Sequence, residues 1–150
     1  MSRDRVWIAL VVAAVVAIVA IGFMFLRGGT ASPVSLTAGD CIDLPSTTAI
    51  TTIPRVSCTE AHAGEVFHVF DVAGSAGAYP SDADWGTLIY PVCDPAFEAY
   101  TGTPVETRTD IDYIYLVPTS DRWAGGDRRV TCLIQSLDGA PLTQSYRAEG

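Results

Sequence analysis

The chain has 150 residues, a net charge of −8, and neither lysine nor asparagine. Beyond residue 34, six arginines stand against sixteen acidic residues, which is a net charge of −10. A surface of that charge repels phosphate, which argues against nucleic acid and against docking on anionic lipid head groups.

An uncharged run extends from Val6 to Leu26. As a helix it would be about 31 Å long, which matches the thickness of a bilayer core. We therefore predict a transmembrane helix over residues 6–26 that anchors the chain. Arg3 and Arg5 precede the run and Arg27 follows it, so residues 1–5 are expected in the cytoplasm. A cleaved signal peptide is the alternative, with a tolerable cleavage site at residues 29–31.

Residues 27–34 are rich in glycine and read as a tether, and residues 35–150 suit one extracytoplasmic domain. Four segments of this domain alternate apolar with polar residues and are rich in β-branched and aromatic side chains, which is typical of strands. These segments are 55–58, 65–72, 111–117 and 129–136. A small, mainly antiparallel sheet is expected.

A helical segment is predicted between the second and third of these strands. Ser81, which is followed by acidic residues, is predicted to be the N-cap, and Gly102 is predicted to end the helix. Apolar residues fall on one face, and these are Trp85, Leu88, Ile89, Phe97 and Tyr100. Pro91 is expected to interrupt or kink the segment. The predicted fold class is therefore α+β, with the sheet packed on one broken helical segment.

Four cysteines, all beyond the apolar run, predict two disulfides, for which the sequence allows three pairings. Their wide spacing argues against a zinc site, whose ligands usually arrive in close pairs. We favour one pairing, in which one disulfide closes the loop that contains the Thr/Ser/Pro-rich stretch 44–54 and the other joins the helix to the sheet. The two bonds are Cys41–Cys58 and Cys93–Cys132.

Together with Cys58, His62 and Glu65 form the one cluster in the sequence whose residue types are typical of catalytic sites. They could make a Cys–His nucleophile pair or, with His68, a metal site. We favour the simpler interpretation, in which Cys58 is bridged and His62 and Glu65 hold a turn by local hydrogen bonds. Nucleophile-elbow, phosphate-loop and calcium-loop motifs are absent from the sequence. We expect neither an enzyme nor a cofactor or metal.

Residues 118–128 are predicted to connect two strands, because proline and glycine flank the segment. Trp123 within it is either a binding hot spot or a plug at the edge of the core, and the plug is favoured. Arg128 next to Asp127 is expected to make local charge-assisted bonds. Trp123, Asp127 and Arg128 are the candidate interaction residues.

Taken in order and spacing, several short elements from residue 39 to about 133 resemble the septum formation domain family of high-GC Gram-positive bacteria. They are Gly39–Cys41, Val56–Cys58, His62, Glu65–Val66, Tyr79–Pro80, Cys93, Phe97, Tyr100–Gly102, Pro118–Thr119, Trp123, Gly126–Arg128 and Cys132. The resemblance implies a cell-envelope protein linked with division septa and often tethered to the membrane. It implies no catalytic residues.

We therefore expect a non-enzymatic, membrane-anchored accessory or interaction module of the cell envelope, with a protein as its partner. The alternatives are a ligand-binding module for a cell-wall fragment or metal and, third, an envelope enzyme. A deep pocket lined by Trp123 and tyrosines would favour a ligand, whereas a flat apolar patch would favour a protein partner.

Overall fold

The computed structural model describes residues 30–31, 35–44, 52–73 and 77–148. The predicted N-terminal segment 1–5, the transmembrane helix 6–26 and most of the tether 27–34 lie outside these residues. Within the described ranges, no helix is both long and apolar enough to cross a membrane.

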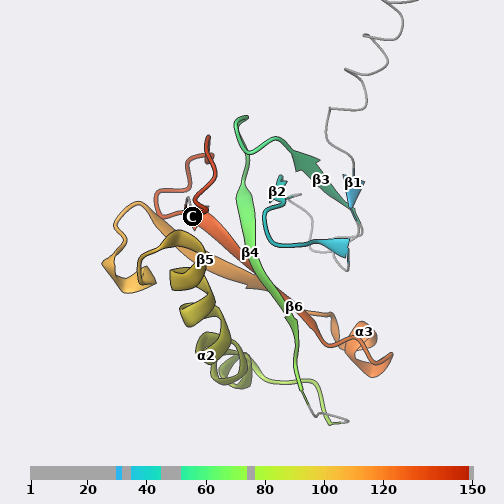
Figure 1. The fold of residues 1–150 in the computed structure, drawn as a ribbon. Helices are drawn as coiled ribbons and strands as arrows, with labels where there is room; N and C mark the ends of the chain where they lie inside the picture. Colours follow the sequence, from blue (N-terminus) through green and yellow to red (C-terminus); the bar gives the residue numbers. More distant parts are fainter. Residues whose placement is uncertain (1–29, 32–34, 45–51, 74–76, 149–150) are drawn as a thin grey trace, which may run out of the picture.

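The described domain is an antiparallel sheet with one long helix against it (Figure 1). The strands lie in the order β1-β3-β2-β4-β6-β5, and every described pair is antiparallel. Their bounds are Thr30–Ala31 (β1), Cys41–Ile42 (β2), Ile53–Val56 (β3), Gly64–Asp71 (β4), Ile111–Leu116 (β5) and Arg129–Ser136 (β6). The predicted α+β class with a mainly antiparallel sheet is confirmed.

The four predicted strands correspond to β3, β4, β5 and β6, and the boundaries of β6 are as predicted. The long central strands β4 and β6 pair from Glu65↔Ile134 to Asp71↔Arg129, with a bulge between Val66 and His68. Strands β1 and β2 were not predicted, because two residues are too few to show an alternating pattern.

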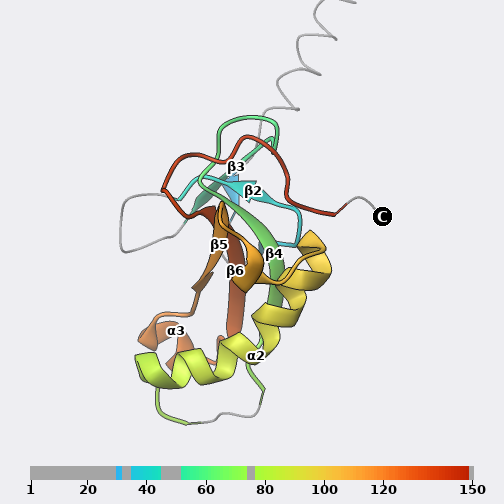
Figure 2. The same ribbon diagram turned by 90° about the vertical axis from the view of Figure 1, so that its left-hand side faces the viewer.

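The predicted helical segment is α2, Asp82–Thr101. It is continuous, so the predicted break was wrong, whereas the alternative, a kink at Pro91, agrees with its shape (Figure 2). Pro91 and Pro95 both lie inside it, and Figure 2 shows a bend between its two halves, as expected where proline removes hydrogen bonds. Ser81 caps the N-terminus in a capping box with Asp84, and Gly102 ends the helix with a φ of 79°.

The buried face of α2 consists of Trp85, Ile89, Cys93, Phe97 and Tyr100. Leu88, which was predicted to share that face, is 37% exposed. The buried residues recur almost every four positions, so the stripe is narrow and a residue one position before Ile89 lies at its margin.

Two hydrophobic clusters occupy opposite faces of the sheet. The larger one joins α2 to β4, β5 and β6 and includes Phe67, Trp85, Phe97 and Trp123. Leu36, Ile42, Ile53, Val66 and Leu133 form the smaller one. Cys41–Cys58 and Cys93–Cys132 are both bonded, with Cα–Cα distances of 5.2 and 6.4 Å, which confirms the predicted pairing.

Candidate functional site

Glu65, at the start of β4, is fully buried and is held by donors from distant parts of the chain. Its Oε1 accepts from the Tyr100 hydroxyl at 2.7 Å and from the Ser145 hydroxyl at 2.5 Å, and its Oε2 accepts from the Tyr146 N–H at 2.7 Å. A buried carboxylate needs such donors to offset its lost hydration. Glu65 therefore joins α2 and the C-terminal segment around Ser145 and Tyr146 to the sheet. The prediction that Glu65 holds a turn by local hydrogen bonds was wrong.

His62 is 1% exposed and lies in a turn before β4. Its Nδ1 lies 2.8 Å from the Glu60 carbonyl oxygen, which can only accept, so Nδ1 carries the proton. Its Nε2 is a buried atom without a hydrogen-bond partner in the described structure. The main chain of His62 also exchanges two hydrogen bonds with Leu142. The ring of His62 thus bonds locally, as the simpler interpretation predicted, while its main chain also pairs with distant Leu142.

Possible metal-ligating atoms of Cys41, His62 and Glu65 lie within 4.8 Å of one another. Cys41 is bonded to Cys58, so its sulfur is neither a thiolate ligand nor a nucleophile. The Glu65 oxygens already accept the three hydrogen bonds described above. His68 is not part of this group, and its ring stacks on Phe70 with centroids 5.8 Å apart. The disulfide-bonded cluster fits a structural role better than a metal centre.

Trp123 lies in α3, Ser120–Ala124, in the predicted connection between β5 and β6. It is buried, packs edge-on against Trp85 with centroids 5.4 Å apart, and donates through Nε1 to the Gly77 carbonyl. Arg128 lies over its ring at 3.8 Å from the centroid. Trp123 is therefore placed as a plug at the edge of the core.

The two charged candidates beside Trp123 also make local contacts. Asp127 forms a salt bridge with Arg122 at 2.8 Å and accepts from the Arg129 N–H. Arg128 donates to the carbonyl oxygens of Trp123 and Asp127. The guanidinium of Arg128 thus makes the expected local charge-assisted bonds, and the salt bridge of Asp127 with Arg122 is a further contact. These contacts hold the α3 loop in shape.

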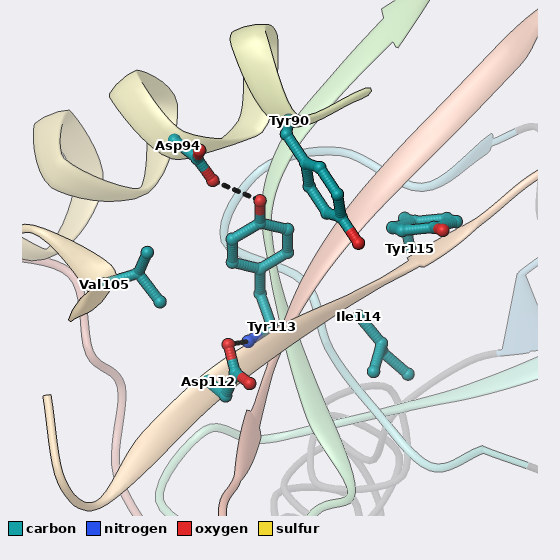
Figure 3. Close-up of a pocket in the computed structure, with 7 residues that line it drawn as sticks. All are labelled: Tyr90, Asp94, Val105, Asp112, Tyr113, Ile114 and Tyr115. Atoms are coloured by element: carbon teal, nitrogen blue, oxygen red, sulfur yellow. Dashed lines mark hydrogen bonds between the residues drawn. The ribbon is translucent and has the colours of Figure 1, made fainter. Parts of the chain in front are cut away.

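An open hollow of about 510 Å³ lies between α2 and β5, and none of the residues that line it was a predicted site residue (Figure 3). Tyr90 and Asp94 line it from α2, and Val105 lines it from the short 3-10 turn η2, Val105–Thr107. Strand β5 contributes Asp112, Tyr113, Ile114 and Tyr115. None of the residues that line the hollow is basic.

The tyrosines of this hollow are held by contacts across it, as Figure 3 shows. The Tyr113 hydroxyl donates to Asp94 on α2. The Tyr90 and Tyr115 rings meet edge to face, with centroids 6.3 Å apart, and Tyr90 remains 51% exposed. Burial, and then the hydrogen bond to Asp94, raise the pKa of Tyr113, so its hydroxyl stays a donor at physiological pH. Burial also raises the pKa of Tyr115.

The hollow combines three tyrosine rings, of which Tyr90 is half exposed and the other two are partly buried, with the carboxylates of Asp94 and Asp112. Rings with an exposed face bind cations or sugar rings, and the carboxylates favour a positively charged group. The signal in the sequence was the pair Tyr113 and Tyr115, which an alternating strand places on one face. Tyr90, which also lines the hollow, belongs to α2 and lies 23 positions before Tyr113 in the sequence. No local sequence pattern predicts that these residues lie close together.

The described residues form a disulfide-bonded α+β domain with an open hollow between α2 and β5. The septum formation family model matches residues 38–149, so the chain belongs to that family. No curated protein and no solved structure matches the chain.

Proposed function

We propose that this protein is a membrane-anchored, extracytoplasmic accessory module of the bacterial cell envelope. In this role it binds a protein partner during septum formation and catalyses no reaction. The proposal combines membership of the septum formation family with the uncharged run 6–26 and its flanking arginines. Two disulfides suit an oxidising compartment outside the cytoplasm.

The observation that carries partner binding is the hollow between α2 and β5. It is open, and it is bordered by Tyr90, which is half exposed. Tyrosine is enriched at protein interfaces because its ring is apolar and its hydroxyl can bond to a partner. The cysteines are all bonded, and the side chains of His62 and Glu65 already have hydrogen-bond partners except at His62 Nε2, which favours binding over chemistry.

Localisation of the full chain in dividing cells tests this proposal. A fluorescent fusion should concentrate at the septum, and the double variant Tyr90→Ala/Tyr115→Ala should lose that enrichment while keeping its membrane association. Leu137→Ala is the matched control, because Leu137 is 52% exposed but lies outside the hollow. A wild-type fusion spread evenly around the membrane would contradict the septal role.

A cell-wall fragment is the second candidate ligand, and one observation favours it. Aromatic rings beside carboxylates, as in Tyr90, Tyr115 and Asp112, also suit a sugar, which packs its ring on the aromatic face and bonds to the acids. Calorimetric titration of the full chain in detergent with a purified disaccharide-peptide wall fragment distinguishes the two. Saturable binding that Tyr115→Ala abolishes would favour the wall fragment over a protein.

A further inference from the structure

Among the described residues, strand β5 lies at an edge of the sheet and pairs only with β6 (Figures 1 and 2). The Leu137 N–H donates to the Asp110 carbonyl, so the main chain of Asp110 faces β6. Because successive residues of a strand present their main-chain groups to opposite sides, those of Ile111, Tyr113 and Tyr115 face away from the sheet. An added strand would pair with these groups.

Part of this edge is protected and part is open. Asp112 Oδ1 accepts from the outward N–H of Tyr113 at 2.7 Å, so the carboxylate shields that donor. Charged side chains on an edge strand are a common device against unwanted pairing. Within the described part of the chain, no hydrogen bond reaches the outward N–H of Tyr115. The open section of the edge therefore begins after Tyr113.

The hollow follows this edge and does not lie on one face of the sheet. Tyr113 and Tyr115 project toward α2, whereas Ile114 belongs to the opposite face and packs against the smaller hydrophobic cluster. Both kinds of residue line the hollow. A chain that enters it thus lies beside the unpaired main chain of β5.

The charge of the hollow indicates what kind of chain fits. Asp94 and Asp112 provide carboxylates, Tyr90 and Tyr115 provide ring faces, and the lining residues include no lysine or arginine. Beyond residue 34 the chain carries a net charge of −10. Cations gain from both carboxylates and aromatic faces, while an acidic segment would be repelled.

We propose that the β5 edge and the hollow together dock an extended, positively charged segment of an envelope protein. This segment adds as a strand beside Tyr115 and places a lysine or arginine between Asp94 and Asp112. Main-chain hydrogen bonds supply the affinity and the acidic, aromatic hollow supplies the selectivity. The inference rests on the proposed function and specifies how the partner is bound.

Fluorescence anisotropy on the full chain in detergent, with labelled synthetic peptides of about twelve residues, tests both parts of the inference. The probe alternates valine or threonine with lysine, and its control carries glutamate in place of lysine. The wild-type chain should bind the lysine peptide saturably and the glutamate peptide not at all. Equal binding of the two peptides, or binding of neither, would overturn the proposal.

Charge recognition is tested with Asp94→Asn/Asp112→Asn. Both new amides keep an oxygen that accepts from Tyr113, so the charge is removed while the hydrogen bonds can remain. This variant should bind the lysine peptide about tenfold more weakly, at an unchanged melting temperature. Asp121→Asn, an exposed acid on α3 outside the hollow, should bind like the wild type. If the wild type and both variants bound the lysine peptide with equal affinity, charge recognition at the hollow would be contradicted.

Strand addition is tested with two N-methylated forms of the lysine peptide, methylated at alternate residues in complementary sets. Only one edge of an added strand faces β5, so one set should lower affinity by about tenfold and the other should leave it nearly unchanged. An equal effect of both sets would contradict strand addition. If no peptide binds while the fusion still concentrates at the septum, this inference fails and the proposed function stands.

Discussion

Glu65 shows how one residue fastens three parts of the fold. It sits on β4 and accepts from Tyr100 on α2 and from Ser145 and Tyr146 in the C-terminal segment. The Ala148 N–H also donates to the Tyr100 carbonyl, and Arg147 lies over the Tyr100 ring at 5.1 Å. Burial, and then the contact with Glu65, raise the pKa of Tyr100, so its hydroxyl remains protonated and donating.

Glu65→Gln should lower the free energy of unfolding by about 2–3 kcal/mol, because a neutral amide replaces a carboxylate that accepts three hydrogen bonds. Urea denaturation of the full, oxidised chain in detergent measures this loss. Glu98→Gln is the matched control, since Glu98 lies exposed on α2. Indistinguishable unfolding midpoints for the two variants would mean that Glu65 does not fasten the C-terminal segment.

The lowered pKa of Asp84 should make the stability of α2 depend on pH. Hydrogen bonds from the Ser81 hydroxyl and main-chain N–H hold the pKa of Asp84 below its ordinary value of 3.8. A lowered pKa in the folded state contributes stability that is present above 3.8 and lost as the pH falls through the folded value. Melting temperature should therefore fall more steeply with acidification in the wild type than in Asp84→Asn. Parallel curves for the two chains would contradict this role.

At the scale of elements, the sequence predicted the long strands and the helix caps but not the continuity of α2. Alternation in 129–136 and the Ser81 and Gly102 signals are local, so they can be recognised without the fold. Pro91 is also local, but its cost of about 3 kcal/mol in a helix interior is outweighed by the packing of the buried face of α2. Tertiary packing decided that outcome.

The two disulfides should differ in their contribution to stability. Cys93–Cys132 joins α2 to β6 with both residues fully buried and closes a loop with a sequence separation of 39, whereas Cys41–Cys58 spans 17. Loop closure predicts about 4 kcal/mol for the first and about 3 kcal/mol for the second. Cys93→Ala/Cys132→Ala should therefore melt below Cys41→Ala/Cys58→Ala. The reverse order in a thermal scan would contradict this ranking.

At the scale of the whole molecule, the candidate site could be predicted less well than the fold. Trp123 and Asp127 stand out in the sequence because they lie in a loop rich in turn residues, yet the structure uses them to hold that loop. The hollow joins Tyr90, Asp94 and Tyr115 through the packing of α2 beside β5. Such proximity depends on the fold and leaves no motif along the chain.

The orientation of the chain in the membrane is a prediction of the charged residues that flank the run 6–26. A reporter that is active only outside the cytoplasm, fused after Gly150, should be active. The product should keep the mass of the uncleaved chain. An inactive reporter would reverse the orientation, and loss of about thirty N-terminal residues would identify a signal peptide in place of an anchor.

The central claim, that this protein works by holding a partner at the hollow, is tested most directly by site-specific photo-crosslinking in dividing cells. A photoreactive amino acid would replace Tyr90, which is 51% exposed at the hollow, or Leu137, which is 52% exposed outside it. We expect one discrete protein adduct from position 90 and none like it from position 137. The adduct should disappear when the chain also carries Asp94→Asn/Asp112→Asn. Identical adduct patterns from both positions, or none from position 90, would contradict it.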